Sequence, residues 1–387
     1  MQEDLDPLPS SFDRPKPGKG TARTATGPAA ELSEALRQAS QPRPAVRTGL
    51  NRMLSFEPLT PVRDLIIVGE GPAAEEIFHY CQEHTVRGYR FRGVFHDKSI
   101  NGVLAPHQLG SIDAAKAFAT QNRIDILYCA LPSSFREEIN GLMEFCERNT
   151  IRFRVIPSVD SFIPVPQATG LTYHGAVPVS RLRNEPLDRW GARAAKRAFD
   201  IVFSFLVITL IFSWLFPILA LLVKLSSKGP VFFKQERLGE RRQQFTCYKF
   251  RSMRTNRECD MKQATRDDPR ITRVGAFLRR SNLDEMPQFF NVLLGQMSVV
   301  GPRPHPLKLN DQFRDIIDKY MVRHFVRPGI TGWAQVNGFR GETRTPELME
   351  KRVDLDVWYL ENWSFRLDLK IVLLTVTNMF RKDEMAY

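Results

Sequence analysis

Cysteine is scarce and widely spaced in this sequence. Five cysteines occur in 387 residues, and no two of them form a CxxC pair. An odd number of scattered cysteines does not build a disulfide framework, and the spacing of a zinc knuckle is also missing. Met1 is followed by polar and acidic residues rather than by a basic segment and an apolar core, so we expect no signal peptide. These absences favour a reducing compartment and synthesis on the cytoplasmic side.

Large apolar side chains are rare in residues 1–61, which are mostly Pro, Ala, Ser, Thr, Gly and Arg. Such a composition cannot offset the entropy of ordering, so we predict a disordered, low-complexity tail with at most one short helix near 30–38. We prefer a solvated linker to an arm that binds lipid or a partner. The whole chain is 43% hydrophobic and 25% charged, enough for two folded domains. Its net charge of +12 predicts an anionic partner such as nucleic acid, lipid headgroups or a phosphorylated substrate.

Strand and helix patterns alternate across residues 62–180. This order predicts a Rossmann-like, CoA-binding-like domain with a parallel sheet and crossover helices. The turn at 69–74 fits G-x-G-x-x-A, whose glycines let backbone amides approach a diphosphate. Asp97 ends the second strand, where a ribose-binding carboxylate would lie, at a longer spacing than usual. Nucleotide binding and a tight turn that merely serves the sheet both remain open.

Charged residues are absent from 201–223, which as a straight helix would cover roughly 34 Å, enough for a bilayer. We therefore expect a membrane helix over 199–225, after a juxtamembrane linker at 181–198. Basic residues flank both ends, and the positive-inside rule disfavours placing either end outside. Pro217 removes a helical hydrogen bond, and Ser213 can help to satisfy the freed polar groups. These features predict a kinked, re-entrant helix; the alternative is an ordinary single span that tolerates a proline.

Basic residues alternate with aromatic and apolar ones after this segment. Nucleic-acid binding is one interpretation, since aromatic side chains stack on bases and arginines bind phosphates. The apolar run would serve no purpose in such a protein. We therefore expect no nucleic-acid partner and favour a phosphate site close to the membrane.

Two adjacent carboxylates, Asp284 and Glu285, precede a short predicted helix at 287–294, which Pro287 starts and Gly295 ends. The dipole of that helix favours ionised carboxylates, which a nucleophile and a metal ligand both require. Adjacent side chains on a helix point in different directions, so we expect two distinct roles rather than one shared proton. The alternative is a structural pair that caps the helix and binds a nearby arginine.

A carboxylate can attack phosphorus when cations neutralise the charge of the phosphate. Five nearby basic side chains are candidates for this neutralisation, namely Lys249, Arg251, Arg279, Arg280 and Arg303. Mg²⁺ held by a carboxylate and by diphosphate oxygens would offset further charge.

Five stretches in the second half of the chain carry a family resemblance: KRAFD, GPVFFKQERLG, FTCYKFRSM, TRVGAFLRRSNLDEMPQFFNVLLGQMSVVGPRP and RPGITGWAQVNG. From Lys196 to about Tyr387 the chain resembles the monotopic bacterial sugar transferases, or polyprenyl-phosphate phosphoglycosyl transferases, which begin exopolysaccharide and glycan assembly. With the sheet domain ahead, it is similar to the subfamily that transfers glucose 1-phosphate or galactose 1-phosphate from a UDP-sugar to undecaprenyl phosphate.

The resemblance implies an α/β chain in which the sheet domain and a re-entrant membrane helix precede a mostly helical catalytic domain at 226–387. It makes Asp284 the nucleophile that attacks the β-phosphorus, releases UMP and carries a covalent phosphosugar, which undecaprenyl phosphate then removes. Glu285 would bind Mg²⁺. The family's phosphate-binding positions match Arg303, Lys249 and, with a looser alignment, Arg340.

The resemblance also implies partners and a location. They are a UDP-sugar, undecaprenyl phosphate and the bilayer at the cytoplasmic face of a bacterial inner membrane, and a homo-oligomer is possible. A different class of function is a non-catalytic, membrane-anchored regulator that senses a nucleotide, which would tolerate Asn in place of Asp284. Longer members of the subfamily carry several membrane helices ahead of the sheet domain and 1–61 has none, yet we expect activity because every catalytic stretch is present. The family often has a Ser-Pro pair at the membrane kink, where this chain has Phe216 and Pro217.

The lipid acceptor should hold the active site at the membrane surface, since each buried CH₂ is worth about 0.8 kcal/mol. We expect the apolar faces of 287–294 and 371–380 to lie there. Trp358, Tyr359 and Trp363 suit headgroup depth, with ordinary core packing as the alternative.

Overall fold

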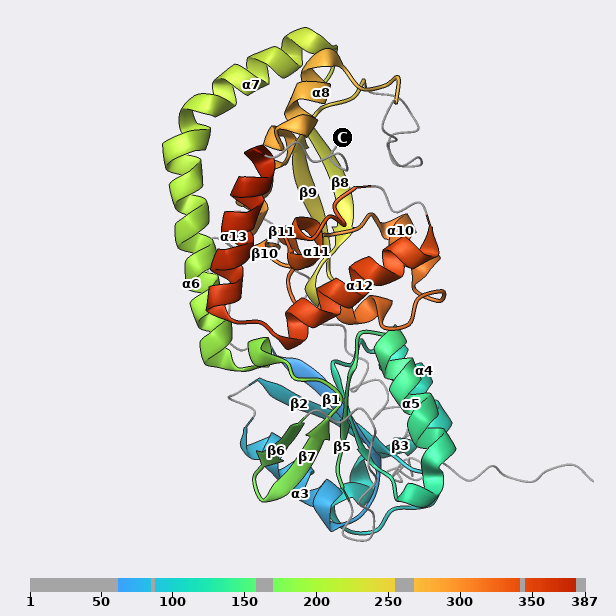
Figure 1. Cartoon of the computed structure of the whole chain (residues 1–387). Coiled ribbons are helices and arrows are strands. Elements are labelled where there is room, and N and C mark those ends of the chain that lie inside the picture. The colour runs from blue at the N-terminus through green and yellow to red at the C-terminus, as the bar shows by residue number, and fades with distance from the viewer. Residues whose placement is uncertain (1–61, 85–87, 158–169, 255–267, 342–344, 381–387) are drawn as a thin grey trace, which may run out of the picture. The chain divides into compact units, whose positions relative to one another are not determined.

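The computed structural model describes residues 62–84, 88–157, 170–254, 268–341 and 345–380 (Figure 1). The short helix expected near 30–38 lies outside the described residues. Along the chain, a sheet with its helices comes first, a long apolar helix follows, and a mainly helical region with two small sheets comes last. The expected mixed α/β class is confirmed.

The first region is a sheet of seven described strands in the order β3-β2-β1-β4-β5-β7-β6. Its parallel strands are β1 (Arg63–Gly69), β2 (Tyr89–Phe95), β3 (Gln108–Gly110), β4 (Ile126–Ala130) and β5 (Arg152–Val155). Two antiparallel strands, β6 (Gly170–His174) and β7 (Val177–Arg181), extend it beyond β5. β1 is buried along its whole length, because an apolar run covered on both faces suits the centre of a parallel sheet.

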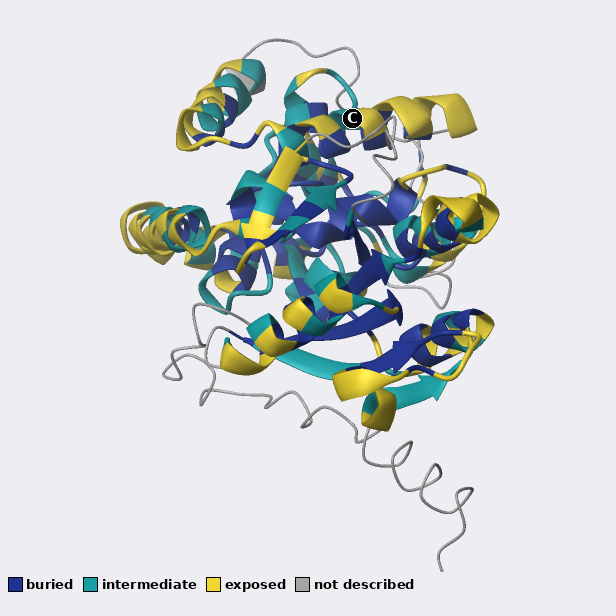
Figure 2. Cartoon of the chain, turned by 90° about the horizontal axis from the view of Figure 1, so that it is seen from below, coloured by how far each residue is buried: buried dark blue, intermediate teal, exposed yellow. Residues whose placement is uncertain are grey.

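Helices cover both faces of this sheet. They are α3 (Pro72–Glu83), α4 (Ile112–Gln121) and α5 (Arg136–Arg148). The strand order changes direction between β1 and β4, so right-handed crossovers place α3 on one face and α4 and α5 on the other (Figure 1). α3 packs on Leu65 and Ile67, while Phe118 of α4 lies 5.3 Å from Phe95, between ring centroids. Seen from below, the central strands are buried and the outer helix faces are exposed (Figure 2).

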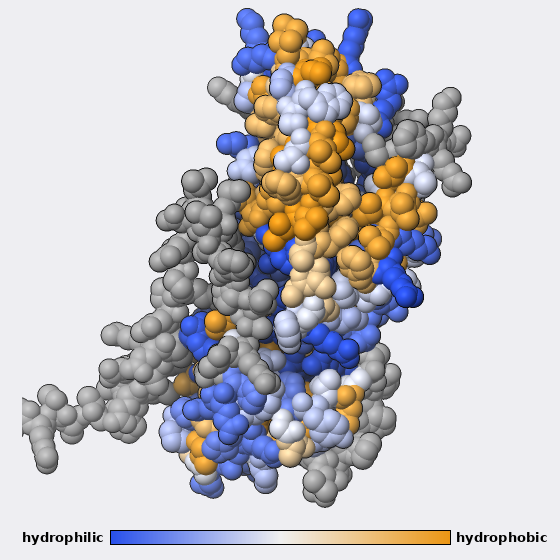
Figure 3. Space-filling view, turned by 90° about the vertical axis from the view of Figure 1, so that its left-hand side faces the viewer, coloured by the Kyte–Doolittle hydropathy of each residue, from blue (hydrophilic) through white to orange (hydrophobic). Residues whose placement is uncertain are grey.

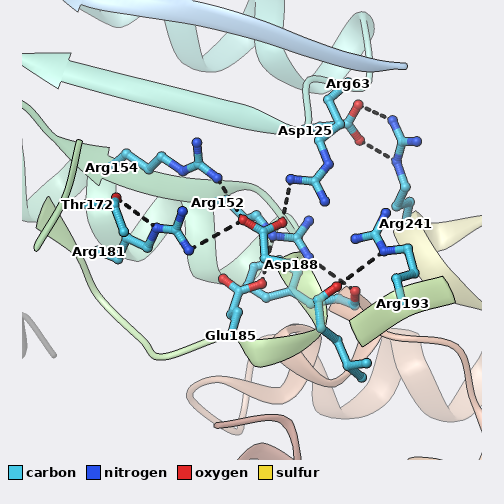
Figure 4. A network of polar contacts seen from close by, with 12 residues as sticks. Arg63, Asp125, Arg152, Arg154, Thr172, Arg181, Glu185, Asp188, Arg193 and Arg241 are labelled. Atoms are coloured by element: carbon cyan, nitrogen blue, oxygen red, sulfur yellow. Dashed lines mark hydrogen bonds and ion pairs between the residues drawn. The ribbon is translucent and has the colours of Figure 1, made fainter. Parts of the chain in front are cut away.

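A buried carboxylate ties the sheet to the segment that follows it. Asp188, in the short 3₁₀ helix η4 (Pro186–Asp188), lies 2.5 Å from Arg63 and 3.1 Å from Arg154 (Figure 4). Burial raises the pKa of Asp188, but the surrounding arginines outweigh it and hold that pKa well below its usual value. These ion pairs therefore join strands β1 and β5 to the start of the next helix.

The next helix is long, apolar and largely uncovered. α6 (Trp190–Val207), a π-helical turn (Ile208–Phe212) and α7 (Ser213–Ser226) form one run of 37 residues, whose most apolar stretch has a mean hydropathy of 2.7 and is 17% buried. The run is long and apolar enough to cross a membrane, and it bends on its way from α6 to α7 (Figure 1). Apolar residues predominate on the face that carries this helix in the space-filling view, with a few weakly polar ones between them (Figure 3). The helix starts in the stretch predicted as a linker, and its re-entrant course stays a prediction.

The last region begins with an antiparallel hairpin of β8 (Phe232–Leu238) and β9 (Gln244–Phe250). Its helices are α8 (Arg273–Arg280), α9 (Gln288–Leu293), α10 (Leu307–Phe313), α11 (Trp333–Val336), α12 (Pro346–Glu361) and α13 (Phe365–Phe380), and its second sheet pairs β10 (Ser298–Val300) with β11 (Gly329–Thr331). Phe199 and Phe203 of α6 pack on its core, which includes Val300, Tyr320 and Leu360. The long helix is therefore part of this folded region.

Three aromatic residues near the end of α12 were expected at headgroup depth. The expectation is wrong for Tyr359 and Trp363, which are 1% and 8% exposed. Their hydroxyl and indole groups donate hydrogen bonds to the buried Asp368, so they belong to the core. Trp358 is 41% exposed and stacks on Trp333.

The C-terminal helix α13 presents apolar side chains to its surroundings. Leu373 is 66% exposed and Val376 is 48% exposed, while Ile371 is fully buried. One face of this helix is thus apolar and exposed over its described side chains, and contact of 371–380 with a membrane stays a prediction.

Candidate active site

The carboxylate pair lies in a tight turn between α8 and α9. Asn282 has a φ of 60°, in the left-handed region, which lets the chain leave α8 and enter the 3₁₀ helix η7 (Leu283–Glu285). α9 follows directly, and Gly295 ends it with a φ of 77°. The predicted short helix and its terminal glycine are confirmed, with Asp284 and Glu285 just ahead of it.

Two cations hold Glu285. Lys249 Nζ lies 2.8 Å from Oε1, and Arg303 binds both carboxylate oxygens at 2.7 and 3.2 Å. Burial raises the pKa of Glu285, but Arg303 and Lys249 outweigh it and hold that pKa well below its usual value. Glu285 is therefore an ionised carboxylate with both oxygens engaged.

Asp284 is buried beside the same cations but unpaired. It is 8% exposed, and no hydrogen bond or ion pair joins its carboxylate to any residue that the structure describes. Burial and the charge of Glu285 raise its pKa, which Lys249 and Arg279 oppose. The expectation that the helix dipole favours ionisation is not met for Asp284, because burial and the charge of Glu285 raise its pKa. The adjacent carboxylates thus differ in environment, as two distinct roles require.

Arg279 and Arg340 lie near the pair and bind residues close to it. Arg279 donates to Ser252 Oγ at 2.9 Å, and Arg340 donates to the side-chain oxygen of Asn282. The charge of Arg279 lowers the pKa of Asp284, and that of Arg340 lowers the pKa of Glu285. These two arginines, Lys249 and Arg303 are four of the predicted phosphate-binding cations, and the structure brings them to one site.

The other two predicted cations lie elsewhere. Arg251 donates to the carbonyl oxygens of Val223 and Ser227 at 3.1 and 2.6 Å, so it closes the C-terminal end of α7. Arg280 is exposed, and no hydrogen bond or ion pair joins it to a described residue. Phosphate binding by these two residues stays a prediction.

A buried network that the motif analysis did not identify positions Arg303. Arg323 Nη2 donates to the Arg303 carbonyl oxygen at 2.6 Å and pairs with Asp356 at 2.7 Å. Two residues after Arg303, His305 meets the Tyr320 hydroxyl at 2.7 Å. Arg323 and Tyr320 both belong to the 3₁₀ helix η8 (Tyr320–Phe325), so the loop that carries Arg303 rests on a buried polar frame. No short pattern in the sequence connects these distant positions.

A close backbone contact holds the same loop from its other side. A Cβ atom on Gly329 would lie 2.1 Å from the Gly301 nitrogen. A side chain at 329 would therefore push apart β10, β11 and the turn to Arg303.

The KRAFD stretch binds the long apolar helix to both segments of the candidate site. Lys196 donates to Val300 O at 2.9 Å, and Asp200 Oδ1 accepts from Val299 N and Ser298 Oγ, both at 2.9 Å. These contacts fix β10, which leads directly to Arg303. The signal was visible in the sequence, because Lys196 and Asp200 are four residues apart and hence on one face of an otherwise apolar helix.

Arg197 has a similar role for the helix that follows the carboxylate pair. Its guanidinium donates to the carbonyl oxygens of Val292 and Leu293 at 2.6 and 2.8 Å, at the C-terminal end of α9. The base of the membrane helix therefore binds the segments that carry Asp284, Glu285 and Arg303.

The predicted kink residues lie in the middle of the long helix. Ser213 Oγ donates to the Thr209 carbonyl oxygen at 2.7 Å, next to the π-helical turn, and Pro217 lies inside α7. The serine hydroxyl thus satisfies a backbone oxygen in the irregular part of the helix.

The predicted nucleotide turn lies at the carboxyl end of β1. Gly69 and Gly71 both have positive φ values, 113° and 114°, as a G-x-G turn requires. Asp97 Oδ1 accepts a hydrogen bond from Ile112 N at 2.9 Å, so this carboxylate already anchors the start of α4. Nucleotide binding at this turn stays a prediction.

The candidate donors for a metal at this site are the two adjacent carboxylates. The described ranges contain no group of three or more His, Cys, Asp and Glu side chains that could hold an ion. Mg²⁺ in proteins is usually bound by one or two carboxylates together with substrate phosphates and water. Glu285 fits such an ion when a phosphorylated substrate supplies the remaining oxygens.

Comparisons with known proteins identify two families along the chain. Residues 191–382 match the bacterial sugar transferase family, and residues 45–157 match a family described as a CoA-binding domain. The chain is 41% identical to the UDP-glucose:undecaprenyl-phosphate glucose-1-phosphate transferase of Escherichia coli (strain K12) over 319 residues, 82% of this chain and 68% of that protein. It is 47% identical to the exopolysaccharide production protein PSS of Rhizobium leguminosarum bv. phaseoli over 189 residues, 47% of this chain and 94% of that protein.

A third relative carries a different sugar in its name. It is the UDP-N-acetylgalactosamine-undecaprenyl-phosphate N-acetylgalactosaminephosphotransferase of Aeromonas hydrophila, 45% identical over 183 residues, which are 47% of this chain and 42% of that protein. The Escherichia coli match is too long to fit within either the sheet region or the site region, so it spans both. Identity at this level over most of the chain shows that the protein is an enzyme of the bacterial sugar transferase family.

Proposed function

We propose that the protein transfers glucose 1-phosphate from UDP-glucose to undecaprenyl phosphate through a covalent phosphosugar on Asp284, with release of UMP. The contrast between the two carboxylates carries this proposal: Glu285 is tied by two cations, while Asp284, buried beside them, is unpaired among the described residues. The substrates follow the name of the Escherichia coli relative, which matches across both regions of the chain. Galactose 1-phosphate is the alternative cargo.

In the first step, an Asp284 oxygen forms a bond to the β-phosphorus of the donor. The bond from that phosphorus to the bridging oxygen breaks, and UMP leaves with the electron pair. A carboxylate without hydrogen bonds keeps its oxygens available for attack, and Lys249, Arg279 and Arg303 offset the charge of the phosphates. In the second step, a phosphate oxygen of the lipid acceptor attacks the same phosphorus, and the bond to Asp284 breaks to restore the carboxylate.

Entry of the donor would rearrange the ion pairs of Glu285. Arg303 and Lys249 bind Glu285 in the free protein, and a diphosphate offers them stronger partners. Their transfer to the diphosphate would release Glu285. Glu285 and the diphosphate oxygens would then hold Mg²⁺, which neutralises further charge on the donor.

The membrane helix would keep this chemistry at the surface of the bilayer. The acceptor lipid cannot leave the membrane at low cost, since each buried CH₂ contributes about 0.8 kcal/mol. The basic flanks of the helix support a place at the cytoplasmic face of a bacterial inner membrane. UDP-sugars and the first steps of exopolysaccharide assembly would meet there.

The test is UMP release by the purified full chain in the presence of Mg²⁺. With UDP-glucose and undecaprenyl phosphate we expect turnover, and with UDP-glucose alone we expect a burst of about one UMP per protein, the mark of a covalent intermediate. Asp284→Asn should abolish both, because the amide is not a nucleophile, and EDTA should suppress both. UDP-galactose in place of UDP-glucose decides between the two cargoes.

Asp354→Asn, at an exposed aspartate of α12, is the matched control and should release UMP as the wild type does. Equal release by wild type and Asp284→Asn would exclude Asp284 as the nucleophile. Turnover without a burst would exclude a stable covalent intermediate.

A further inference from the structure

A groove lies between the membrane helix and the catalytic segment. It encloses about 620 Å³, within the range of about 300–1,000 Å³ that small-ligand sites occupy. Its walls come from the π-helical turn and the start of α7, from one face of the β8–β9 hairpin and from the beginning of α9: Ile208, Thr209, Phe212, Ser213, Phe216, Phe232, Lys234, Tyr248, Pro287 and Phe290. Three separate elements therefore enclose one hollow.

The groove walls are mostly apolar, and the hydroxyl groups among them are already hydrogen-bonded within the helix. Thr209 Oγ1 donates to the Phe205 carbonyl oxygen at 2.8 Å and Ser213 Oγ to the Thr209 carbonyl oxygen at 2.7 Å, so both hydroxyls are engaged within the helix. Phe216 stacks on Phe232 with ring centroids 5.6 Å apart. Such a surface favours hydrocarbon over water.

The groove leads to the nucleophile. The chain is helical from η7 into α9, where residues three apart lie on the same side. Asp284, Pro287 and Phe290 therefore form one stripe, whose second and third members line the groove. Glu285 lies on a different side of this helix, where Lys249 and Arg303 bind it.

The groove contains one cation, on the opposite hairpin face from Lys249. Lys234 pairs across the hairpin with Tyr248, and its neighbour Phe233 pairs with Lys249, so the two lysines point to opposite faces. Lys249 binds Glu285, whereas Lys234 is exposed and has no hydrogen bond or ion pair with a described residue. Its ammonium lies 5.9 Å from the Tyr248 ring centroid. The hairpin thus offers a separate cation to a second phosphate.

We propose that this groove binds the first isoprene units of the polyprenyl phosphate acceptor, with Lys234 attracting the acceptor phosphate. This inference rests on the proposed function and adds the place where the second substrate sits. The acceptor has an anionic phosphate next to a hydrocarbon chain, and the groove has a cation next to apolar walls, so the two are complementary. Leu210 and Trp214, 66% and 58% exposed on the same stretch of helix, would lie in the bilayer, so the chain reaches the groove without crossing water.

Filling the groove tests this placement. Thr209→Trp puts an indole into the hollow from an exposed position of an apolar helix, and Leu210→Trp makes the same change one residue away, outside the lining. We expect Thr209→Trp to raise the KM for undecaprenyl phosphate about tenfold or more, as the loss of two buried methylene contacts would. The loss should fall on the acceptor-dependent step, with the UMP burst retained. Leu210→Trp should stay within about twofold of the wild type for both quantities.

The role of Lys234 is tested by substitutions that remove or keep its positive charge. Lys234→Gln should raise the KM for undecaprenyl phosphate several-fold and weaken its dependence on salt, whereas Lys234→Arg should restore most of the affinity. A normal KM in both Thr209→Trp and Lys234→Gln would overturn the assignment.

A second measurement does not depend on turnover. A polyprenyl phosphate with a benzophenone in its first isoprene units should label peptides from 208–216 or from α9 in the full chain, and excess undecaprenyl phosphate should prevent this. Label confined to other segments, or displaced equally by phosphatidylglycerol, would overturn the proposal in favour of a general lipid site. Absence of a UMP burst in the wild type would instead contradict the proposed function, and the labelling would still decide where the lipid binds.

Discussion

Asp284 and Glu285 are neighbours in this site, but their surroundings shift the pKa values of the two carboxylates in opposite directions. Arg303 and Lys249 neutralise Glu285 directly, and the negative charge of Glu285 then acts on Asp284 across one peptide unit. A buried carboxylate beside a fixed negative charge is a stronger base than one in water, and stronger bases are better nucleophiles. In the proposed mechanism, the ion pairs of Glu285 would thus prepare Asp284 for attack.

The fall of the UMP-burst rate at acidic pH should depend on this interaction between Asp284 and Glu285. Burial and Glu285 raise the pKa of Asp284, and Lys249 opposes them, so the rate of the UMP burst should fall as the pH drops through a value above 3.8. Lys249→Met removes an opposing positive charge and should move that fall to higher pH, whatever its effect on the maximal rate. Stopped-flow or quenched-flow measurement of UMP at several pH values provides the check.

Lys351→Met, at an exposed lysine of α12, is the control and should leave the profile in place. A fall that moves to lower pH in Lys249→Met would contradict this account of the two carboxylates.

At the scale of elements, the base of the membrane helix organises the site. α6 fixes β10 through Lys196 and Asp200 and closes the C-terminal end of α9 through Arg197. A helix whose apolar side chains are exposed further along its length thus also forms a wall of the folded region that carries the site. If this helix inserts into a membrane as proposed, membrane attachment and the arrangement of the candidate site would be coupled.

Asp200→Ala should expose this role. It would leave Val299 N and Ser298 Oγ without their buried partner, which costs about 2–4 kcal/mol of unfolding free energy. We expect a lower melting temperature in detergent micelles, and a loss of UMP release already below that temperature because β10 leads to Arg303. Differential scanning fluorimetry of the full chain measures the first effect.

Ile201→Ala, one residue on and 42% exposed, should melt close to the wild type. Similar melting of the two variants would show that the Asp200 contacts contribute little to the fold.

At the scale of the whole described chain, buried ion pairs join the sheet to the regions around it. Asp188 gathers arginines from β1 and β5 just before α6, and Arg241 of the β8–β9 hairpin pairs with Asp125 of the sheet (Figure 4). Breaking a buried pair costs more than forming it contributes, because the remaining charge stays without a partner. These contacts therefore make the stability of the chain sensitive to pH.

Asp188→Asn should reduce stability at neutral pH by about 3 kcal/mol, the scale of a broken buried pair. The pKa of Asp188 is lower in the folded chain than its unfolded value of 3.8. Its ionised form therefore stabilises the fold above that unfolded value, and the contribution disappears as the pH falls through the folded pKa. The difference from the wild type in urea unfolding should accordingly be largest near neutral pH and shrink under strong acid.

The exposed Asp113 of α4 provides the comparison, and Asp113→Asn should show a small difference at every pH. A difference between Asp188→Asn and wild type that grows on acidification would contradict the direction of the pKa shift.

Local sequence patterns were sufficient to predict much of the fold of this protein. The apolar run, the α/β alternation and the helix between Pro287 and Gly295 were predicted because hydrophobic spacing, proline and glycine act over a few residues. The family resemblance also singled out Asp284, Glu285 and the cations Lys249, Arg303 and Arg340, which the structure brings to one site.

Folding decided which residues support that site and which do not. Arg251 closes α7, Tyr359 and Trp363 enter the core, and Arg323 holds the Arg303 loop from a distant segment. The groove beside Lys234 arises where three elements meet. Burial, ion-pair choice and cavities depend on contacts between residues far apart in the chain, and no local pattern contains them.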